Sequence, residues 1–442
     1  MTNEELKRKL LSGKPEDIQD IVDHVHPADI LELVHDDEDS AKDLLLSLPD
    51  EMIADVLEEE DEDERFRFLT LFFENRQKAI LNAMEDDELA DMIGELNKDE
   101  QTRLLDALEP EARAAIENLL QYEPDTAGGI MTLDFINIHA NNSVMDTLNY
   151  LHTQTIHEMD DDLFVTDKRK VLKGVVSLRD LVAAPFDTPI MDITNTNVHY
   201  VHPRDDQEDV ASQFVRYGYL TMPVVDKKMR VLGVIEIDDI MDVIEEETTE
   251  DINRLGGTSG EEKVDSTVSE SVHSRLPWLV VNLFTAVMAA AVVAHFEGTI
   301  ARVVSLSAVM SIVTGMGGNA GTQSLTILVR GLSLGEVDRH NAIKIFLKEI
   351  TVGLLTGIAI GVIVGVGSMI FQHNAWFGLV AGLAMILNMI VANLAGFLVP
   401  IILERFHVDP ALASGVFVTT VTDCLGFFFF LGLATLFLPL LI

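Results

Sequence analysis

Residues 409–426 read DPALASGVFVTTVTDCLG, and they open an apolar segment that continues to Ile442. At about 1.5 Å per residue, a helix of this length crosses the roughly 30 Å of hydrocarbon in a bilayer. Asp423 lies inside the segment. A carboxylate at bilayer depth is costly to bury, and residues of this kind usually serve a function. The stretch therefore predicts a membrane span that carries a functional aspartate.

One face of this predicted span is small and polar. Gly415, Thr419, Asp423 and Gly426 fall on the same side of a helix, and Thr420 lies next to Thr419. Such a face offers a cation a carboxylate together with hydroxyl and carbonyl oxygens. We interpret it as part of an ion pathway. The alternative is a packing face on which the aspartate is protonated or hydrogen-bonded to a neighbour.

The sequence predicts five membrane spans, at residues 277–296, 302–328, 344–371, 376–403 and 412–440. The loops on one side of these spans carry several basic residues, whereas those on the other side offer Arg302. The basic set consists of Arg330, Arg339, Lys344, Lys348 and Arg405. By the positive-inside rule, the N-terminal part is cytoplasmic and the C-terminus is outside. The opening residues, MTNEELKRKLL, contain no apolar signal core, which agrees with this orientation.

The second predicted span contains a glycine-rich stretch, GMGGNAGTQ, at residues 315–323. Each glycine weakens a helix by roughly 1 kcal/mol relative to alanine. Helices that line a water-filled path or pack very closely can accept this cost. We take Asn319 and the adjacent Gly318 as candidates for the pathway. Asn388, in the fourth span, is either pathway-lining or a hydrogen-bonding contact between helices.

The part of the chain before these spans is strongly acidic. Of the formal net charge of −42, all but one unit lies before Pro277. Such a field repels nucleic acid and concentrates divalent cations. The single cysteine, Cys424, excludes an internal disulfide. The sequence has no glycine-rich phosphate loop, zinc-type pattern or nucleophile elbow, so we predict that the protein is not an enzyme.

Residues 1–126 are predicted to form an acidic, all-helical domain. Similar helix openings, with proline or an acid in the first turn, recur at residues 26–31, 48–53, 84–89 and 108–112. Stacked helical hairpins that form a small superhelix are typical of such repeats.

Residues 127–250 contain a clearer duplication. The segments at 163–167 and 174–180 return at 223–226 and 233–239, and the glycine of GVVSLRD recurs in GVIEIDD after 59 residues. Each copy predicts a strand, a turn, a second strand and a helix. The duplication looks like a tandem pair of CBS domains, an α/β arrangement that acts as a ligand sensor. This resemblance implies that an adenine nucleotide is a candidate ligand.

A charged linking helix is predicted at residues 240–275, followed by a transmembrane domain at 276–442. With these parts in place, the chain resembles the MgtE family of bacterial magnesium channels or transporters over nearly its full length. The most specific pieces are GGNAGTQ at 317–323 and the stretch from Asp409 to Asp423. The resemblance implies a homodimer with a central pore, in which Asp423 of each subunit holds hydrated Mg²⁺ and the linking helix acts as a plug.

The acidic domains are predicted to sense cytosolic Mg²⁺. At low Mg²⁺ their carboxylates repel one another, and at high Mg²⁺ bound ions bridge them and close the pore. The candidate metal ligands are surface acids of three regions and the entrance of the fifth span. They are Asp87, Asp91 and Glu95; Asp238, Asp239 and Asp242; Glu245, Glu246 and Glu250; and Asp409. A solvated surface acid is the alternative for each of them.

Mg²⁺ is the expected cargo because the pathway offers oxygen ligands, which suit a hard cation, and Mg²⁺ usually keeps several of its waters. Two other functions stay open at this point. One is transport of Mn²⁺, Co²⁺ or Ni²⁺, against which the absence of His and Cys from the predicted pathway faces argues. The other is a nucleotide sensor that the spans merely anchor in the lipid bilayer, and in that case a change at Asp423 would have no effect.

Overall fold

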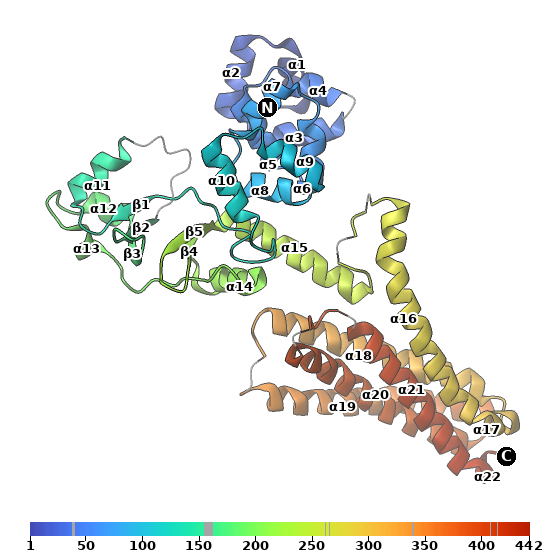
Figure 1. Ribbon diagram of the computed structural model, residues 1–442. Helices are drawn as coiled ribbons and strands as arrows, with labels where there is room; N and C mark the ends of the chain where they lie inside the picture. The colour runs from blue at the N-terminus through green and yellow to red at the C-terminus, as the bar shows by residue number, and fades with distance from the viewer. Residues whose placement is uncertain are drawn as a thin grey trace. The chain divides into compact units, whose positions relative to one another are not determined.

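The structure is a computed structural model that describes residues 1–37, 40–153, 162–260, 262–264, 266–337, 340–406, 408–412 and 414–442. Arg339, one of the residues used to orient the spans, lies outside this part of the chain. The described residues divide into two compact units, Met1–Val243 and Ile244–Ile442 (Figure 1).

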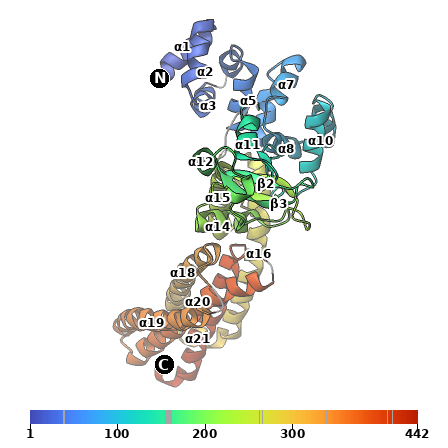
Figure 2. The same ribbon diagram turned by 90° about the vertical axis from the view of Figure 1, so that its left-hand side faces the viewer.

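The first half of the first unit is helical, as predicted. Its helices follow one another from α1 and α2 to α8 and α10 in Figure 2. The four predicted helix openings are confirmed, since α3, α5, α8 and α10 begin at Pro27, Asp50, Asp86 and Pro110. The helices are α1 (Asn3–Ser12), α2 (Pro15–His24), α3 (Pro27–Asp36), α4 (Ala41–Leu45), α5 (Asp50–Glu58), α6 (Glu62–Leu69), α7 (Glu74–Leu81), α8 (Asp86–Gly94), α9 (Lys98–Leu105) and α10 (Pro110–Leu119).

The predicted duplication is also confirmed. Strand β2 pairs with β3 and β4 pairs with β5, both antiparallel, and β1 runs parallel to β2. The tight turns of the two hairpins place Lys170 and Met229 at positive φ, at equivalent places in the two copies. The elements are β1 (Asn137–His139), α11 (Val144–Leu151), β2 (Asp162–Thr166), β3 (Leu172–Ser177), α12 (Leu178–Ala183), α13 (Ile190–Ile193), α14 (Gln207–Tyr217), β4 (Thr221–Val225), β5 (Val231–Glu236) and α15 (Ile237–Gly256).

The repeated glycines explain how the two copies hold each other. Thr132, which precedes the first copy, pairs with Val234 in the second, and Asn195, which precedes the second copy, pairs with Val175 in the first. The segment of Thr132 passes over β5 at Gly233, and the segment of Asn195 passes over β3 at Gly174. A Cβ at Gly233 would lie 2.5 Å from the carbonyl oxygen of Thr132, and the same position in the first copy is equally crowded. Strand exchange therefore requires glycine at this position of the repeat.

We expect Gly233→Ala to destabilise the first unit by about 1–3 kcal/mol, because the added methyl group overpacks against backbone that cannot rotate away. Thermal unfolding of the purified protein measures the change. Gly256→Ala is the matched control, since no atom lies within 4 Å of a Cβ built there. Equal melting temperatures for the two variants would contradict this account of the repeated glycine.

The linking helix is shorter than predicted. It ends at Gly256, not at residue 275, and the next helix already begins at Val268. The helix of the first span, α16, therefore begins nine residues before the predicted start at Pro277, which lies inside it. A capping box formed by Thr267 and Glu270 marks the true start, and the Thr-x-x-Glu spacing in the sequence could have revealed it.

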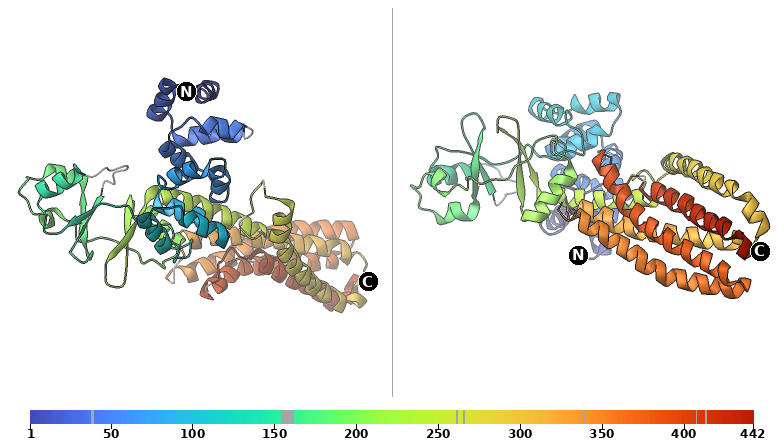
Figure 3. Two further views of the ribbon diagram at one scale, coloured as in Figure 1. Left: turned by 45° about the horizontal axis from the view of Figure 1, so that its top comes forward. Right: turned by 90° about the horizontal axis from the view of Figure 1, so that it is seen from below.

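The second unit contains the predicted spans (Figure 3, yellow to red). Four of its described helices, α16, α19, α20 and α21, are long and apolar enough to cross a membrane. The remaining predicted span, the second one at 302–328, corresponds to α18, which is 28 residues long but less apolar, and lies against α20 and α21. The helices are α16 (Val268–His295), α17 (Glu297–Arg302), α18 (Leu306–Ser333), α19 (Ala342–Gln372), α20 (Ala375–Arg405), α21 (Ser414–Leu436) and α22 (Leu438–Leu441).

A row of glycines joins α19 to α20. Gly353, Gly357, Gly361 and Gly365 recur every four residues along α19 and face the backbone of α20. A Cβ at Gly361 or Gly365 would lie 2.9 Å from a carbonyl oxygen of α20. Small residues at this spacing let helices approach closely in a membrane, where packing rather than hydrophobicity drives association. This close contact was not predicted, although the spacing of the four glycines is visible in the sequence.

Candidate ion pathway and cation-binding sites

Helix α18 has one packed face and one exposed polar face. Gly317, Gly321 and other buried residues lie toward α20 and α21. Gly315, Asn319 and Thr322 lie on the exposed side, as their spacing predicts. Gly318 is half-buried between the two faces. The glycines thus serve close packing on one side and leave Asn319 accessible on the other.

Helix α21 places Asp423 in a half-buried position. The hydroxyl of Thr419 donates to the carbonyl oxygen of Gly415 at 2.9 Å, and that of Thr420 donates to Val416 at 2.6 Å. With their protons used inside the helix, both hydroxyl oxygens keep lone pairs that can accept hydrogen bonds or coordinate a cation. Gly426, on the same predicted face, is buried and lies against Asn388.

The two asparagines of α20 are buried. Asn388 donates from Nδ2 to the carbonyl oxygen of Val313 on α18 at 2.8 Å, and Asn393 donates to Met389 within its own helix at 2.8 Å. Of the two interpretations left open by the sequence, the structure supports the contact between helices for Asn388, since its side chain has no exposed surface.

One buried carboxylate of the second unit was not predicted from the sequence. Glu349, near the start of α19, is buried and accepts a hydrogen bond from the hydroxyl of Ser324 at 2.8 Å. The amino group of Lys348 lies 3.3 Å from its other oxygen. In the sequence, the Lys348–Glu349 pair directly precedes a long apolar run. Charged residues at such a position resemble those that commonly flank a membrane span.

Within the second unit, Arg254 binds the C-terminal end of the linking helix to the segment that precedes α21. This guanidinium pairs with Glu250 one turn earlier and with Asp409 at the entrance of α21. Glu250 and Asp409 are both candidate ligands predicted from the sequence, and the structure brings them together. It does so through an arginine, a cation that the prediction did not consider.

The same end of α15 makes two further contacts. Asp251 accepts a hydrogen bond from the Ser333 hydroxyl at 3.2 Å, and burial raises the pKa of the Asp251 carboxyl above its ordinary value. Leu255 packs against a buried apolar cluster. That cluster is formed by Leu325, Val329, Ala395, Ala411 and Val418.

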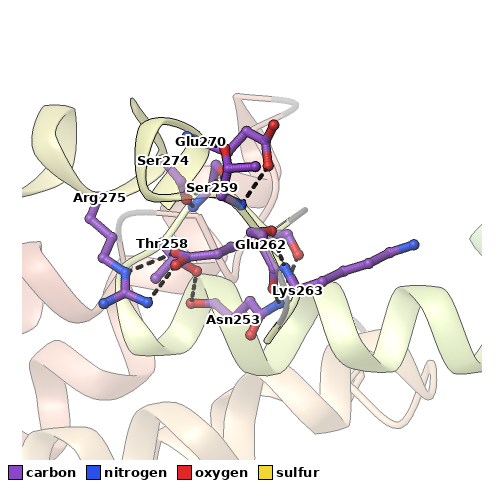
Figure 4. A network of polar contacts seen from close by, with 11 residues as sticks. Asn253, Thr258, Ser259, Glu262, Lys263, Glu270, Ser274 and Arg275 are labelled. Carbon is purple, nitrogen blue, oxygen red and sulfur yellow. Dashed lines mark hydrogen bonds and ion pairs between the residues drawn. The ribbon is translucent and has the colours of Figure 1, made fainter. Parts of the chain in front are cut away.

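Polar contacts tie the segment after α15 to both neighbouring helices (Figure 4). Asn253 donates from its amide to the carbonyl oxygen of Gly260 at 2.8 Å. Arg275 on α16 forms a bidentate pair with Glu262, and the Nε–Oε2 distance is 2.9 Å. Gly260 and Glu262, which lie between the two helices in sequence, thus each bind a side chain of one of them.

In the first unit, the start of α8 lies near the start of α15. Acidic residues of the two helices are close enough for the charges on one helix to shift the pKa of carboxyl groups on the other. They are Asp87 and Glu88 on α8, and Asp238, Asp239 and Asp242 on α15. This cluster joins two of the regions that the sequence analysis selected for cation sensing. We call it the α8–α15 carboxylate cluster.

Burial and mutual repulsion strain the α8–α15 carboxylate cluster. Desolvation, followed by the charge of Glu88, raises the pKa of Asp87 to about 7. Desolvation and the charge of Asp87 raise the pKa of Asp239 well above its ordinary value. Arg65 offsets part of this by pairing with Glu88 at 2.5 Å. An added cation would relieve the rest, because it favours the ionised forms of all these groups.

The remaining predicted ligands are placed differently. Asp91 is half-buried on α8, whereas Glu95 lies just past the end of that helix and is exposed. Glu245 and Glu246 are exposed on the part of α15 that belongs to the second unit. Within the described ranges, no three His, Cys, Asp or Glu side chains surround a common metal position. The individual metal ligands therefore stay predictions.

A cavity of about 210 Å³ opens within the duplicated region. Ser177 donates from its hydroxyl to Asp180 at 2.8 Å on one side of it, and Arg179 lies between them in sequence. His199 and Tyr219 line another side, with ring centroids 5.4 Å apart. The hydroxyl of Thr221 is buried in the wall and has no hydrogen-bond partner among the described residues.

The sequence matches three family models. Residues 25–125 match the MgtE intracellular N domain, residues 127–187 and 190–246 match CBS domains, and residues 310–433 match the MgtE divalent cation transporter domain. These matches follow the order of parts predicted from the sequence.

Curated proteins named "Magnesium transporter MgtE" are similar to most of the chain. The protein from Enterococcus faecalis is 38% identical over 74% of this chain and 72% of its own length. That from Thermus thermophilus is 35% identical over 75% of this chain and 74% of its own. That from Bacillus subtilis is 33% identical, with the same coverage as the Thermus protein.

Two solved structures resemble about half of the chain. The cytosolic domain of the Mg²⁺ channel MgtE in complex with ATP is 32% identical, covers 55% of this chain and 100% of its own, and gives a TM-score of 0.51. The soluble part of a magnesium transporter is 33% identical, covers 55% of this chain and 95% of its own, and gives a TM-score of 0.50.

Proposed function

Because the chain belongs to the MgtE family of divalent cation transporters, we propose that it carries Mg²⁺ across a membrane under the control of its N-terminal domains. The observation that carries the proposal is the polar line through otherwise apolar helices. Asn319 is exposed on α18, and Asp423 is half-buried on α21. Polar groups at membrane depth are retained where they face a water-filled path or one another.

The pathway is formed by two copies of the chain. In a single chain the polar face of α18 is exposed, and lipid cannot satisfy its hydrogen bonds. A second copy related by twofold symmetry would enclose this face. Two Asp423 carboxylates would then balance the charge of one Mg²⁺, which keeps most of its waters. A potential of about 100 mV, negative inside, favours entry of a divalent ion by roughly 4.6 kcal/mol, so no other energy source is required.

Regulation follows from the acidic domains. The N-terminal domains are cytoplasmic, and with five crossings the C-terminus lies outside. Cytosolic Mg²⁺ binds the α8–α15 carboxylate cluster and favours the compact arrangement of the first unit. Further Mg²⁺ acts at Glu250 and Asp409, where Arg254 now holds the linking helix. The domain limits 1–126, 127–250, 240–275 and 276–442 belong to the same proposal, with the linking helix shortened to 237–256.

The direct experiment is uptake of Mg²⁺ into liposomes that contain the purified protein, with Mg²⁺ on the side of the acidic domains set low or high. We expect uptake that stops at high Mg²⁺. Mn²⁺ and Co²⁺ are tested in parallel, because preferential uptake of either would favour the competing cargo. Protein-dependent uptake of none of these ions would refute the transport proposal.

The cavity in the duplicated region binds an adenine nucleotide. A ring can stack on His199 and Tyr219, Arg179 can pair with phosphate, and Asp180 can accept hydrogen bonds from ribose hydroxyls. The unpartnered hydroxyl of Thr221 supports this assignment, because an unsatisfied buried group costs roughly 1–3 kcal/mol unless a ligand satisfies it.

Thr221→Val is expected to act in opposite directions on stability and binding. Removing the unpartnered hydroxyl should leave the melting temperature of the nucleotide-free protein unchanged or raised, and should weaken ATP binding about tenfold. Differential scanning fluorimetry and isothermal titration calorimetry measure the two effects. Thr166→Val is the matched control, since its hydroxyl donates to Asn137 at 2.7 Å away from the cavity. Unchanged ATP affinity in Thr221→Val would exclude this hydroxyl from the site.

A further inference from the structure

Asn388 stands where three helices of the second unit meet. Its Nδ2 donates to the carbonyl oxygen of Val313 on α18, at 2.8 Å. Glycines make room for its amide on both neighbours: a Cβ at Gly317 on α18 would overlap Nδ2, and a Cβ at Gly426 on α21 would lie 2.9 Å from the same atom. The amide of α20 is therefore inserted between α18 and α21.

Packing alone does not explain this asparagine. The side chain is fully buried, and Oδ1 accepts no hydrogen bond from the described residues. A buried acceptor without a partner is unfavourable, whereas an apolar side chain of similar shape carries no such cost. Leucine would fill the same space between two glycines and would be at least as stable. The amide is thus retained at a cost to stability, which points to a role in function.

The two helices that Asn388 joins are those that carry the candidate pathway residues. Gly317 lies two residues before Asn319, and Gly426 lies one helical turn after Asp423. We propose that Asn388 is a positioning residue for Mg²⁺ transport. Its bond to Val313 sets the separation and register of α18 and α21, and hence the fit of the pathway to hydrated Mg²⁺. This inference rests on the transport function proposed above.

A small change in that separation should affect ion discrimination more than folding. Mg²⁺ demands near-ideal geometry and gives up its waters reluctantly, so a path that fits its hydrated form tolerates little displacement. Loss of the tether should let α18 and α21 shift and admit ions that exchange water more readily. The expected signature is a changed ratio of Mg²⁺ to Mn²⁺ uptake in a protein that still folds.

The test uses the full-length protein in liposomes and four variants. These are Asn388→Leu, Asn388→Ala, Gly317→Ala and the double variant Asn388→Ala/Gly317→Ala. Gly317→Ala alone should be poorly folded, because the new methyl group overlaps the amide. The double variant exchanges the two volumes and should regain the melting temperature. We expect the ratio of Mg²⁺ to Mn²⁺ uptake to fall about tenfold in both Asn388→Leu and the double variant.

A wild-type uptake ratio in folded Asn388→Leu, or in the double variant, would show that Asn388 only fills space and would overturn the inference. Failure of both proteins to fold would overturn it as well, because the argument requires that packing at the junction not depend on the amide. If the wild-type protein itself takes up no Mg²⁺, the proposed function is refuted and this inference falls with it. An altered ratio at an unchanged melting temperature supports both.

Discussion

Replacement of Asp423 by asparagine is expected to reduce Mg²⁺ uptake about 100-fold or more. The variant keeps the shape of the side chain and removes its charge. A charged hydrogen bond or ion contact contributes roughly 1.5–3 kcal/mol, and a dimer would lose two such contacts at one ion. The contact matters most for the ion in transit, because no other carboxylate was predicted on this face of α21.

The measurement is the initial rate of Mg²⁺ entry into liposomes at a fixed membrane potential. Glu404→Gln is the matched control, since it removes one negative charge from an exposed position at the end of α20. Its uptake should remain near the wild-type rate. Asp423→Glu, which keeps the charge but moves it, should fall between the two. Similar rates for Asp423→Asn and wild type would remove this residue from the ion path and revive the membrane-anchored sensor as the better interpretation.

Local patterns in the sequence predicted much of the fold. The duplicated glycines, the helix openings and the apolar spans depend on residues that are near neighbours in the chain, so their spacing carries the information. Where the prediction placed a helix end wrongly, as at the start of α16, a local signal was present and was not used. Thr267 and Glu270 formed that signal.

Contacts between distant residues could not be predicted in the same way. The pairing of Arg254 with Asp409 joins positions 155 residues apart. The sequence around either residue gives no indication that the other is its partner. Asn388 illustrates a second limit. Its helical face is compatible with lining a pathway or with joining helices, and only the position of Gly317 and Gly426 decides between them. The large number of acidic residues is a third limit. Many carboxylates have the helical spacing expected of a cation site, but only a few of them are buried, and burial cannot be seen in the sequence.

The α8–α15 carboxylate cluster predicts an unusual dependence of stability on pH. Asp87 has a pKa of about 7 in the folded protein, against about 4 in an unfolded chain. Between these values the folded form binds more protons, so the free energy of unfolding falls as the pH rises through this window. From pH 5.5 to 7, Asp87 alone would lose about 2 kcal/mol at roughly 1.4 kcal/mol per pH unit. Most acidic residues, whose pKa is lowered by folding, act in the opposite direction.

Mg²⁺ should abolish this loss. In a chelator, we expect the melting temperature of the first unit to fall by about 4–8 °C between pH 5.5 and 7, at roughly 2–4 °C per kcal/mol for a unit of this size. With Mg²⁺ bound, the carboxylates remain ionised and neutralised, so the fall should disappear and the stabilisation by Mg²⁺ should grow with pH. Scanning fluorimetry of the full-length protein, with chelator or with Mg²⁺, measures both effects.

Asp239→Asn provides the decisive comparison. It removes a carboxyl group whose pKa is itself raised by burial and by the charge of Asp87, and it keeps the shape of the side chain. One group that binds a proton in the folded protein is then lost, so the fall in melting temperature should shrink. The same variant should need more Mg²⁺ for stabilisation, because one ligand charge is lost. Asp180→Asn, on the cavity side of the duplicated region, should leave the pH dependence unchanged. A pH profile in Asp239→Asn identical to that of the wild type would show that sensing of Mg²⁺ lies outside this cluster, even if transport through the pathway of Asp423 holds.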